Sequence, residues 1–275
     1  MCATLMNDLL KLSPLVIEAV EKSARLDLYA AAPSKLKQDF AIQSASSEVA
    51  TLLACRGLAA SEFNRAFVSA DAEKPLLTEL LAWLDAHADG SWMVQIANHT
   101  HTSRTRAEAQ QLNLLTVGAG WSKLGALTGQ VAKPLTTNNM VITLNMSADF
   151  ASTIAQVYGF SEEVGQWFGN LAGRPNWHVF IAFVQGKPVG AAAMYVAGEW
   201  AWLGISGTIA DFRGQGVQSA LITARANLAQ ELGVRYLTAE TGRPATLGGK
   251  HTSRDICLRA GFTDLYQKIN YRRPH

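Results

Sequence analysis

Hydrophobic residues in the first half of the chain recur at spacings that alternate between those of a helix and those of a strand. Residues 7–32 carry leucine, valine or alanine about every three or four positions, which predicts an amphipathic helix despite Pro14. The other apolar segments are shorter and are separated by polar residues. This alternation is typical of an α/β arrangement. The further elements that we expect are strands at 49–55 and 92–97 and helices at 75–87 and 104–115.

The second half begins with a predicted strand at 141–146 and two short helices within 150–171, and then its pattern changes. Three apolar runs follow one another with connections only a few residues long. The connections, at 185–188 and 197–199, each contain glycine and have the composition of tight turns. One antiparallel sheet is therefore expected from the runs at 179–184, 189–196 and 200–205.

A long helix is predicted after this meander. Its apolar residues fall on one stripe from Gly216 to Leu232, and Gly233 suits the left-handed position that ends many helices. The helix is expected to cover the sheet. The next strand, 234–240, should then lie parallel to 200–208 through a right-handed crossover. The predicted order ends with a helix at 253–260 and a strand at 265–271.

Chain length and a change in composition predict two domains. A chain of 275 residues exceeds the size at which single cores usually stop growing. Glycine, proline, threonine and asparagine cluster at 129–139 between apolar segments, which places a boundary there. We therefore expect one domain at residues 1–130 and a second at 140–275. With 48% hydrophobic and 17% charged residues, the chain can bury a sizeable core.

Charge and cysteine content narrow the classes of function. The formal net charge is +2 without a long basic run, so nothing favours electrostatic capture of nucleic acid. No stretch approaches the ~20 apolar residues that span a bilayer, and the N-terminus lacks the basic start of a signal peptide. The three cysteines supply neither a disulfide framework nor metal-ligand spacing. We expect a cytoplasmic protein with no nucleic acid partner, no membrane partner and no metal.

Residues 211–221 carry the most informative pattern, because a glycine-rich loop there leads from a strand into the long helix. Glycine allows a sharp turn and a close approach to a ligand, and the free N–H groups at a helix N-terminus form a pyrophosphate site. Arg213 would add a charge-assisted contact. A dinucleotide fingerprint fits poorly, since its sixth position counted from Gly214 is Ser219 and the upstream strand belongs to an antiparallel meander.

The same loop resembles the acyl-CoA loop of the GNAT acyltransferase superfamily. The usual pattern of that loop is Gln or Arg, two residues, Gly, one residue, then Gly or Ala. Arg213 and Gly216 match it, and Gln218 departs from it. The order of meander, loop, long helix, strand, helix, Ala260-Gly261-Phe262 and terminal strand is also similar to the family from about Val141 onward. The resemblance implies an α/β (α+β) fold with a mixed, mostly antiparallel sheet flanked by helices.

Further segments look like a bacterial tandem group of this superfamily that carries a degenerate second copy at its N-terminus. The resemblance implies two related halves, with residues 40–128 forming a decayed GNAT-like half without a glycine loop. Whether that half shapes the acceptor pocket or only stabilises the fold is left open. The segments that carry this resemblance are Thr241-Gly242, Ser253-Arg254-Asp255, Tyr266 with Asn270-Tyr271 and, more loosely, 62–65 and 120–123.

The resemblance also implies a cosubstrate, acetyl-CoA, bound between strands 200–208 and 234–240. An acceptor amine would attack its thioester directly. Backbone N–H groups of the first strand would hold the carbonyl oxygen and the pantetheine, and the loop would hold the pyrophosphate. The implied contacts are Ser206, Gly207, Thr208, Ile209, Arg213, Gly214, Gln215, Gly216, Val217, Gln218 and Ser219.

Two residues are candidate catalysts. Glu240, at the end of a strand beside the expected cleft, is the preferred base because partial burial would make its carboxylate more basic. Its alternative is a structural carboxylate paired with an arginine, and Glu199 is the fallback base. Many GNAT enzymes place a tyrosine four residues before the glycine of the final Gly-Phe to protonate the departing thiolate, and Cys257 stands there. Cys257 is either this acid or a packing residue, with Tyr266 as a substitute acid.

Three hypotheses remain open from the sequence. The leading one is an acetyl-CoA-dependent N-acetyltransferase acting on a small-molecule or amino-acid-like amine. The second is a non-catalytic protein that binds or senses acyl-CoA. In the third, the glycine loop is only a turn that begins a helix, and the chain is an interaction protein. The acceptor, the acyl chain and the oligomeric state, a homodimer included, are not given by the sequence.

Overall fold

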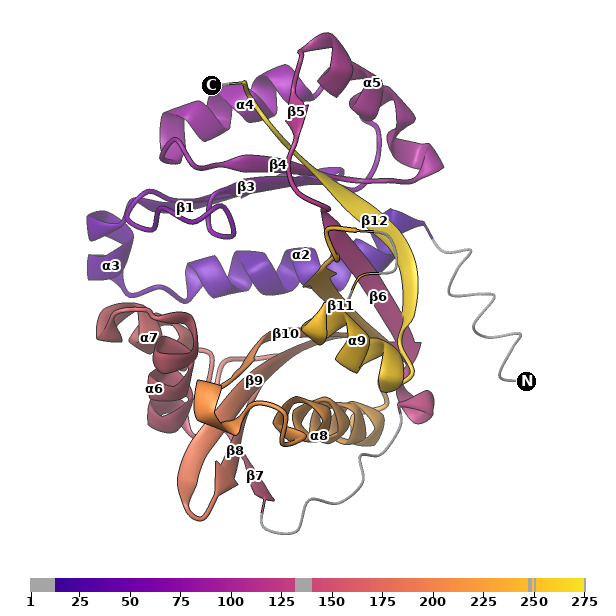
Figure 1. The fold of residues 1–275 in the computed structure, drawn as a ribbon. Coiled ribbons are helices and arrows are strands. Elements are labelled where there is room, and N and C mark those ends of the chain that lie inside the picture. The colour runs from indigo at the N-terminus through magenta and orange to yellow at the C-terminus, as the bar shows by residue number, and fades with distance from the viewer. Residues whose placement is uncertain (1–12, 132–139, 247–248, 250, 275) are drawn as a thin grey trace. The chain divides into compact units, whose positions relative to one another are not determined.

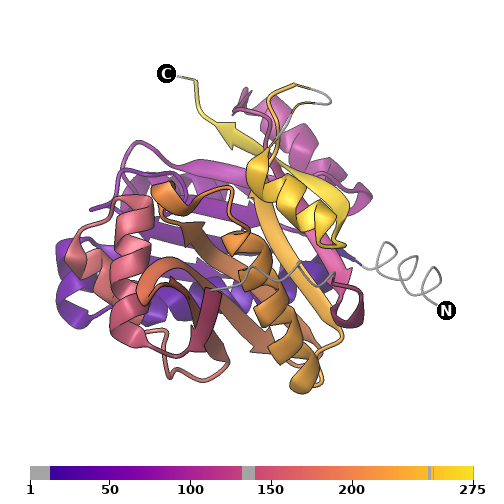
Figure 2. The ribbon, with the colours of Figure 1, turned by 60° about the horizontal axis from the view of Figure 1, so that its bottom comes forward.

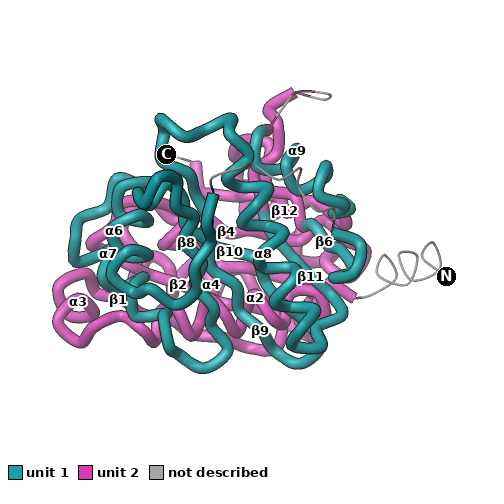
Figure 3. Tube along the Cα trace, turned by 90° about the horizontal axis from the view of Figure 1, so that it is seen from below, with its two compact units in different colours: residues 1–9, 124–240, 252–264 teal, residues 10–123, 241–251, 265–275 magenta. Residues whose placement is uncertain are grey.

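The computed structural model describes residues 13–131, 140–246, 249 and 251–274. Three features of the sequence lie outside the described residues. They are Cys2, the expected start of the first helix, and most of the expected boundary at 129–139. The chain divides into two compact units, each assembled from separate segments (Figure 3). Unit 1 contains 124–240 and 252–264, and unit 2 contains 10–123, 241–251 and 265–275.

Unit 1 is an antiparallel meander to which one parallel strand is added. Strands β7, β8, β9 and β10 pair antiparallel in succession, and β11 pairs parallel with β10. Helices α6 and α7 cover one face of this sheet and α8 covers the other (Figure 1; Figure 2). The elements are β7 (Met140–Leu144), α6 (Ser147–Tyr158), α7 (Glu162–Gly169), β8 (Trp177–Val184), β9 (Lys187–Ala197), β10 (Trp200–Thr208), η3 (Ala210–Phe212), α8 (Val217–Glu231), β11 (Tyr236–Gly242) and α9 (Thr252–Arg259).

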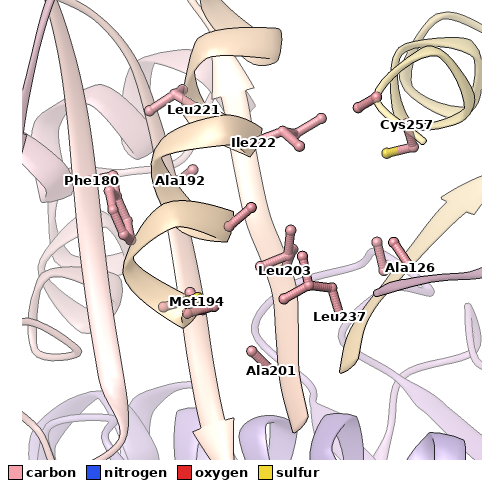
Figure 4. Packing of buried hydrophobic residues seen from close by; sticks show 14 of the residues in the cluster. Ala126, Phe180, Ala192, Met194, Ala201, Leu203, Leu221, Ile222, Leu237 and Cys257 are labelled. Atoms are coloured by element: carbon pink, nitrogen blue, oxygen red, sulfur yellow. The ribbon is translucent and has the colours of Figure 1, made fainter. Parts of the chain in front are cut away.

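The face of the sheet beneath α8 carries the apolar core of unit 1 (Figure 4). Leu221 and Ile222 of α8 belong to one buried cluster with Leu203 of β10 and Leu237 of β11, and none of the four is more than 6% exposed. Because strand side chains alternate between faces, the neighbours of Leu203 and Leu237 belong to the opposite face. The predicted stripe packs only in part: Val217 and Leu221 are buried, whereas Leu232 is 49% exposed. Ile222, Ala226 and Ala229, which were not in the stripe, are buried as well.

The strands of unit 2 pair in both antiparallel and parallel fashion, with helices on both faces. Strands β1, β2 and β3 pair antiparallel in succession, β4 pairs parallel with β3, and β12 pairs antiparallel with β4. The elements are α2 (Pro14–Ala30), α3 (Ser34–Asp39), β1 (Ile42–Ser46), β2 (Ala50–Cys55), β3 (Arg65–Val68), α4 (Leu77–His87), β4 (Met93–Ala97), η1 (Thr100–Thr102), α5 (Ser103–Gln111), β5 (Leu115–Thr116) and β12 (Thr263–Arg272), with β6 (Trp121–Leu127) and η2 (Thr128–Gln130) leading into unit 1.

The two units repeat one order of elements. Unit 1 runs α6, α7, β8, β9, β10, α8, β11, α9, and unit 2 runs α2, α3, β1, β2, β3, α4, β4, α5. In each, three antiparallel strands precede a helix, and the next strand lies parallel to the third. The expected fold class, a mostly antiparallel mixed sheet flanked by helices with two related halves, is confirmed.

Three local features differ from the sequence expectations. The main segment of unit 1 begins at Leu124, near the expected boundary, but residues 241–251 and 265–275 belong to unit 2. Strand β12 forms backbone hydrogen bonds with β4, as in the pair Lys268 and Ala97. Pro14 does not interrupt a helix but starts α2, where its missing N–H costs nothing, and the Ser13 hydroxyl accepts from the next free N–H. Helix α3 and strands β1, β3 and β6 were not expected.

The described helices were also compared with the length and hydropathy of a membrane span. None of those in the described part of the chain is both long and apolar enough to cross a bilayer.

Candidate functional site

The loop between β10 and α8 turns through two glycines with left-handed backbone. Gly214 has φ of 77° and Gly216, which directly precedes α8, has φ of 81°. A Cβ at Gly214 would meet nothing within 4 Å, so this glycine is needed for its conformation and leaves open space beside the backbone. Among the described residues, no side chain caps the start of α8. Its first N–H groups are therefore available to an outside acceptor.

Three polar side chains at the loop donate to nearby residues of the loop or of the end of β10. Arg213 Nε donates to the Thr208 carbonyl at 3.4 Å, and Gln215 Nε2 donates to the Asp211 carbonyl at 3.2 Å. Gln218 Nε2 donates to Thr208 Oγ1 at 2.9 Å. Gln218, which departs from the family pattern, therefore ties the first turn of α8 to the end of β10. Arg213 remains exposed at the mouth of the loop.

Strands β10 and β11 are paired at one end and separate toward the loop. Their parallel pairing covers Trp200 with Tyr236 through Trp202 with Thr238. Beyond this point β10 continues to pair with β9 as far as Thr208. Beyond Trp202, the edge of β10 that faced β11 thus has no β11 partner among the described residues, and such a strand edge can pair with an extended ligand. Glu240 lies two residues beyond the last pair.

A β-bulge re-aims the backbone of β10 where the strands separate. The register with β9 shifts between Gly204 and Ser206, and Ile205 between them has φ of 48°. A non-glycine residue with positive φ is costly and is kept where the fold requires it. The Tyr158 hydroxyl donates to the Ser206 carbonyl at 2.9 Å. A Cβ at Gly207 would lie 2.1 Å from Val157 Cγ1, so glycine there allows α6 to pack against the strand.

Glu240 lies on the face of β11 away from α8. Leu237 and Ala239 are in the core beneath α8, and alternation places Thr238 and Glu240 on the other face. The Glu240 side chain is half-buried, and one of its oxygens is shielded from solvent. A shielded carboxylate at the strand separation has the position that a base would need.

Cys257, the other candidate catalyst, lies in the apolar core of unit 1. It is 8% exposed on α9 and faces the same cluster as Leu237 (Figure 4). Burial raises the pKa of its thiol to about 11, although the buried Arg225 guanidinium opposes that shift. Arg225 itself donates to the Leu221 and Ala193 carbonyls at 3.1 Å and 3.2 Å. Glu240 and Cys257 therefore lie against opposite faces of β11: Glu240 is on the face away from α8, and Cys257 of α9 packs in the cluster that contains Leu237.

The remaining candidates have other partners. Glu199 is 59% exposed in the turn before β10 and pairs with Arg235 at 3.1 Å, at the end of β10 opposite to the bulge. Tyr266 lies in unit 2, where its hydroxyl donates to Glu18 Oε1 at 2.8 Å.

Sequence reasoning missed the bulge at Ile205 and the contact from Tyr158. Gly204 and Gly207 were the available signal, because glycines inside a strand often mark a bulge or a close approach of another element. No sequence pattern indicates that Tyr158, 48 residues away, reaches Ser206.

Residues 147–247 match the sequence model of the Acetyltransferase (GNAT) family. That segment runs from α6 through β11, so it contains the bulged strand, the glycine loop and Glu240. No curated protein sequence matches this chain significantly.

Solved structures with the same fold include GCN5-related N-acetyltransferases. One from Kribbella flavida is 14% identical, covering 92% of this chain and 94% of that chain, with a TM-score of 0.59. One from Sphaerobacter thermophilus is 15% identical, covering 82% and 80%, with a TM-score of 0.59. A tandem GNAT protein from the clavulanic acid biosynthesis pathway is 14% identical, covering 94% and 96%, with a TM-score of 0.57.

The sequence match covers the site, and the structural matches cover most of the chain. The resemblance drawn from the loop is therefore confirmed: residues 147–247 match the GNAT family model, and the chain has the fold of the GCN5-related N-acetyltransferases.

Proposed function

We propose that this protein is an acetyl-CoA-dependent N-acetyltransferase that transfers an acetyl group to the amine of a small-molecule or amino-acid-like acceptor. The observation that carries the proposal is the start of α8, which no described side chain caps, beside two strands that stop pairing. The match of residues 147–247 to the GNAT family model supports the acyltransferase assignment.

The glycine loop and α8 would hold the pyrophosphate of acetyl-CoA. The N–H groups of Val217, Gln218 and Ser219 lie in the first turn of a helix of 15 residues, where the dipole favours an anion. Gly214, Gln215 and Gly216 let the phosphates approach the backbone, and the exposed Arg213 would supply a charge. The pantetheine would extend along the unpaired edge of β10, at Ser206, Gly207, Thr208 and Ile209.

The bulged backbone of β10 and the carboxylate of Glu240 would serve the chemical step. Glu240 takes a proton from the acceptor ammonium, and the free amine attacks the thioester carbonyl. A C–N bond forms, and N–H groups near Ser206 hold the negative carbonyl oxygen. When this intermediate collapses, the C–S bond breaks, and the nitrogen gives up its extra proton, which balances the proton that the CoA thiolate takes up. The products are the neutral amide and CoA thiol, and the proton on Glu240 is released to solvent.

Of the two candidate catalytic residues, Cys257 has the weaker support. Its thiol is protonated at neutral pH, since burial raises its pKa to about 11. An ordinary thiol has a pKa of ~8.5. Proton transfer from Cys257, the weaker acid, to a CoA thiolate would therefore be unfavourable. A packing role in the core beneath α8 is therefore the role that we assign to it ahead of general acid catalysis.

The two halves and the cellular setting complete the proposal. We assign catalysis to residues 140–275 and a degenerate GNAT-like half to residues 1–130, on the repeated order of elements. A cytoplasmic location would supply acetyl-CoA and would keep the free thiols of Cys55 and Cys257 reduced.

Calorimetric titration with acetyl-CoA and with CoA tests the proposal. Gly216→Glu should weaken binding at least about 100-fold, because its carboxylate would meet the phosphates at the start of α8. Gly198→Glu is the matched control: Gly198 also has positive φ, 57°, and open space, in the turn between β9 and β10. It reproduces the backbone strain without touching the loop and should bind as wild type does.

Release of free CoA in the presence of a panel of small amines then tests turnover. Wild type that binds acetyl-CoA and releases CoA with at least one amine would support the transferase. Binding without release for any amine would favour the acyl-CoA sensing role instead. Folded wild type that binds neither acetyl-CoA nor CoA would overturn both.

A further inference from the structure

Unit 2 contains a cavity of about 210 Å³ between helix α2 and the face of the sheet that α2 covers. Every residue that lines it belongs to unit 2. One side comes from α2, the floor comes from β2 and β3, and Lys268 of β12 closes one end. At ~30 Å³ per molecule the cavity has room for about seven waters, so it fits a ligand of roughly ten non-hydrogen atoms. A whole CoA molecule is far too large.

The charged groups around this cavity are equal in number and opposite in sign. Three carboxylates and three cations line it, and they are Glu18, Glu21, Glu48, Lys22, Arg25 and Lys268.

The inner charges form a fixed network. Lys268 Nζ lies 2.8 Å from Glu18 Oε2, and Arg25 lies 2.8 Å from Glu21 Oε1. The buried ammonium of Lys123 pairs with both carboxylates. Burial alone would raise the pKa of Glu18 and of Glu21, but the neighbouring lysines outweigh it and hold both pKa values below the ordinary range. Both carboxylates are therefore charged at neutral pH.

Such a network is a poor way to stabilise a fold. Taking paired charges out of water often costs as much as their attraction returns, and apolar residues would fill the space between α2 and the sheet more cheaply. Here charged groups of both signs line a concave cavity instead. A concave site with a few convergent charged groups is characteristic of ligand binding.

Apolar and hydroxyl groups fill the rest of the wall. The Phe67 ring lies on the floor with Arg25 at 5.0 Å and Lys268 at 5.1 Å from its centroid. Thr51 and Ser69 add hydroxyl groups. At the rim, Glu48 is exposed and Lys22 is partly exposed. A ligand of one charge would face like charge across the cavity, whereas a ligand that carries both charges can match both.

We propose that the cavity under α2 is a binding site for a small zwitterion, a free amino acid in chemical class, with its ammonium facing the carboxylates and its carboxylate facing the cations. None of the residues that line this cavity belongs to the GNAT-family segment at 147–247. The site would give the degenerate half a ligand of its own.

Ligand-observed NMR of the full chain with each of the twenty common free amino acids at millimolar concentration is the first measurement, followed by calorimetry on the strongest binder. We expect at least one amino acid to bind. Its decarboxylated amine and its deaminated acid should each bind at least about tenfold more weakly, because each leaves one set of charges unmatched. If no amino acid binds, or if either singly charged analogue binds as tightly as the amino acid, the proposal is wrong.

Two substitutions on the same helix locate the site. Ala19 is exposed and lines the cavity, so Ala19→Trp should fill it and lower affinity at least about tenfold. Val16, 44% exposed on α2, does not line the cavity, so Val16→Trp should bind as wild type does. Equal affinity of Ala19→Trp and wild type would overturn the assignment. Gly216→Glu should keep amino acid binding, which separates this proposal from the acetyl-CoA proposal.

Discussion

Helices α8 and α4 hold the same place in the order of the two units, but their N-termini are used differently. Each follows the third antiparallel strand and precedes the parallel one. At α8 the loop carries Gly214 and Gly216, and no described side chain caps the helix. At α4 the Glu108 carboxylate of α5 accepts from the N–H groups of Leu76 and Leu77 at 3.0 Å and 2.8 Å.

This difference teaches that the architecture alone does not make a phosphate site. A helix N-terminus attracts an anion through its free N–H groups and its dipole. In unit 2 the protein supplies that anion itself, so the helix is stabilised and the site is closed. In unit 1 the position stays open, which is consistent with the proposed binding of acetyl-CoA there.

The strands after these helices, β11 in unit 1 and β4 in unit 2, also differ in the residue beyond their parallel pairing. The parallel pairing ends at Thr238 in unit 1 and at Ile96 in unit 2. Two residues farther on, unit 1 has Glu240 and unit 2 has Asn98. A carboxylate can accept a proton at neutral pH and an amide cannot. Unit 2 therefore lacks both the uncapped helix start and a counterpart of the proposed base, Glu240.

The largest expected effect is that of Glu240→Gln. Removing the proposed base should lower kcat at least about 100-fold, while the Kd for acetyl-CoA from calorimetry stays near that of wild type. Glu231→Gln, at the exposed end of α8, is the control and should leave kcat unchanged. A Glu240→Gln variant with wild-type kcat would remove Glu240 from the mechanism.

The next largest effect is expected from Glu108→Ala, which should lower the stability of the fold. It removes the acceptor of two N–H groups at the start of α4, which should cost about 1–2 kcal/mol in the free energy of unfolding by urea. Glu79→Ala, exposed in the first turn of α4, should cost less. Acetyl-CoA should still bind with a stoichiometry of one. If the variant bound a second molecule of acetyl-CoA, Glu108 alone would be what blocks anion binding at the start of α4.

Asp71 should give unit 2 an acid-sensitive contribution to stability. Burial would raise its pKa, but hydrogen bonds from Thr105 and Arg104 at the start of α5 outweigh this and lower the pKa. The pKa of Asp71 in the folded protein lies below its value in the unfolded chain, ~3.9. The stabilisation is therefore complete at pH values above ~3.9 and is lost as the pH falls through the folded pKa.

Urea unfolding followed from neutral pH into this acid range measures the effect. Asp71→Asn should be less stable than wild type at neutral pH by about 1 kcal/mol, and the difference should shrink as the acid range is crossed. Glu18 and Glu21 also have lowered pKa values, but they are common to both proteins and cancel in the difference. A difference independent of pH would contradict the capping role of Asp71.

The smallest effect is expected from Gln218→Ala, which restores the residue type usual in the family. It removes the bond to Thr208 Oγ1 but leaves Gly214 and Gly216, which set the path of the loop. The Kd for acetyl-CoA should change by less than about threefold. A larger loss would show that the contact between Gln218 and Thr208 holds the loop in its binding conformation.

The sequence by itself determined much of unit 1. The meander, the long helix, the parallel strand after it and the glycine loop were all predicted, because each depends on residues close together in the chain. Period-2 and period-3.6 patterns report local structure directly. Gly214 and Gly216 likewise indicate left-handed backbone, because glycine has no Cβ and adopts positive φ readily.

Only the tertiary structure decided the rest. Strands β1 and β3, with five and four residues, are too short to show a periodic pattern, and partners on other strands hold them in place. Glu108 caps a helix that begins 31 residues before it, and Glu18 meets Lys268 across 250 residues. The divergence of β10 from β11, the opposite faces of Glu240 and Cys257 and the cavity under α2 likewise depend on which distant segments pack together. Local sequence carries no signal for these pairings, because packing and ion pairing are set by proximity in space, not by proximity in the chain.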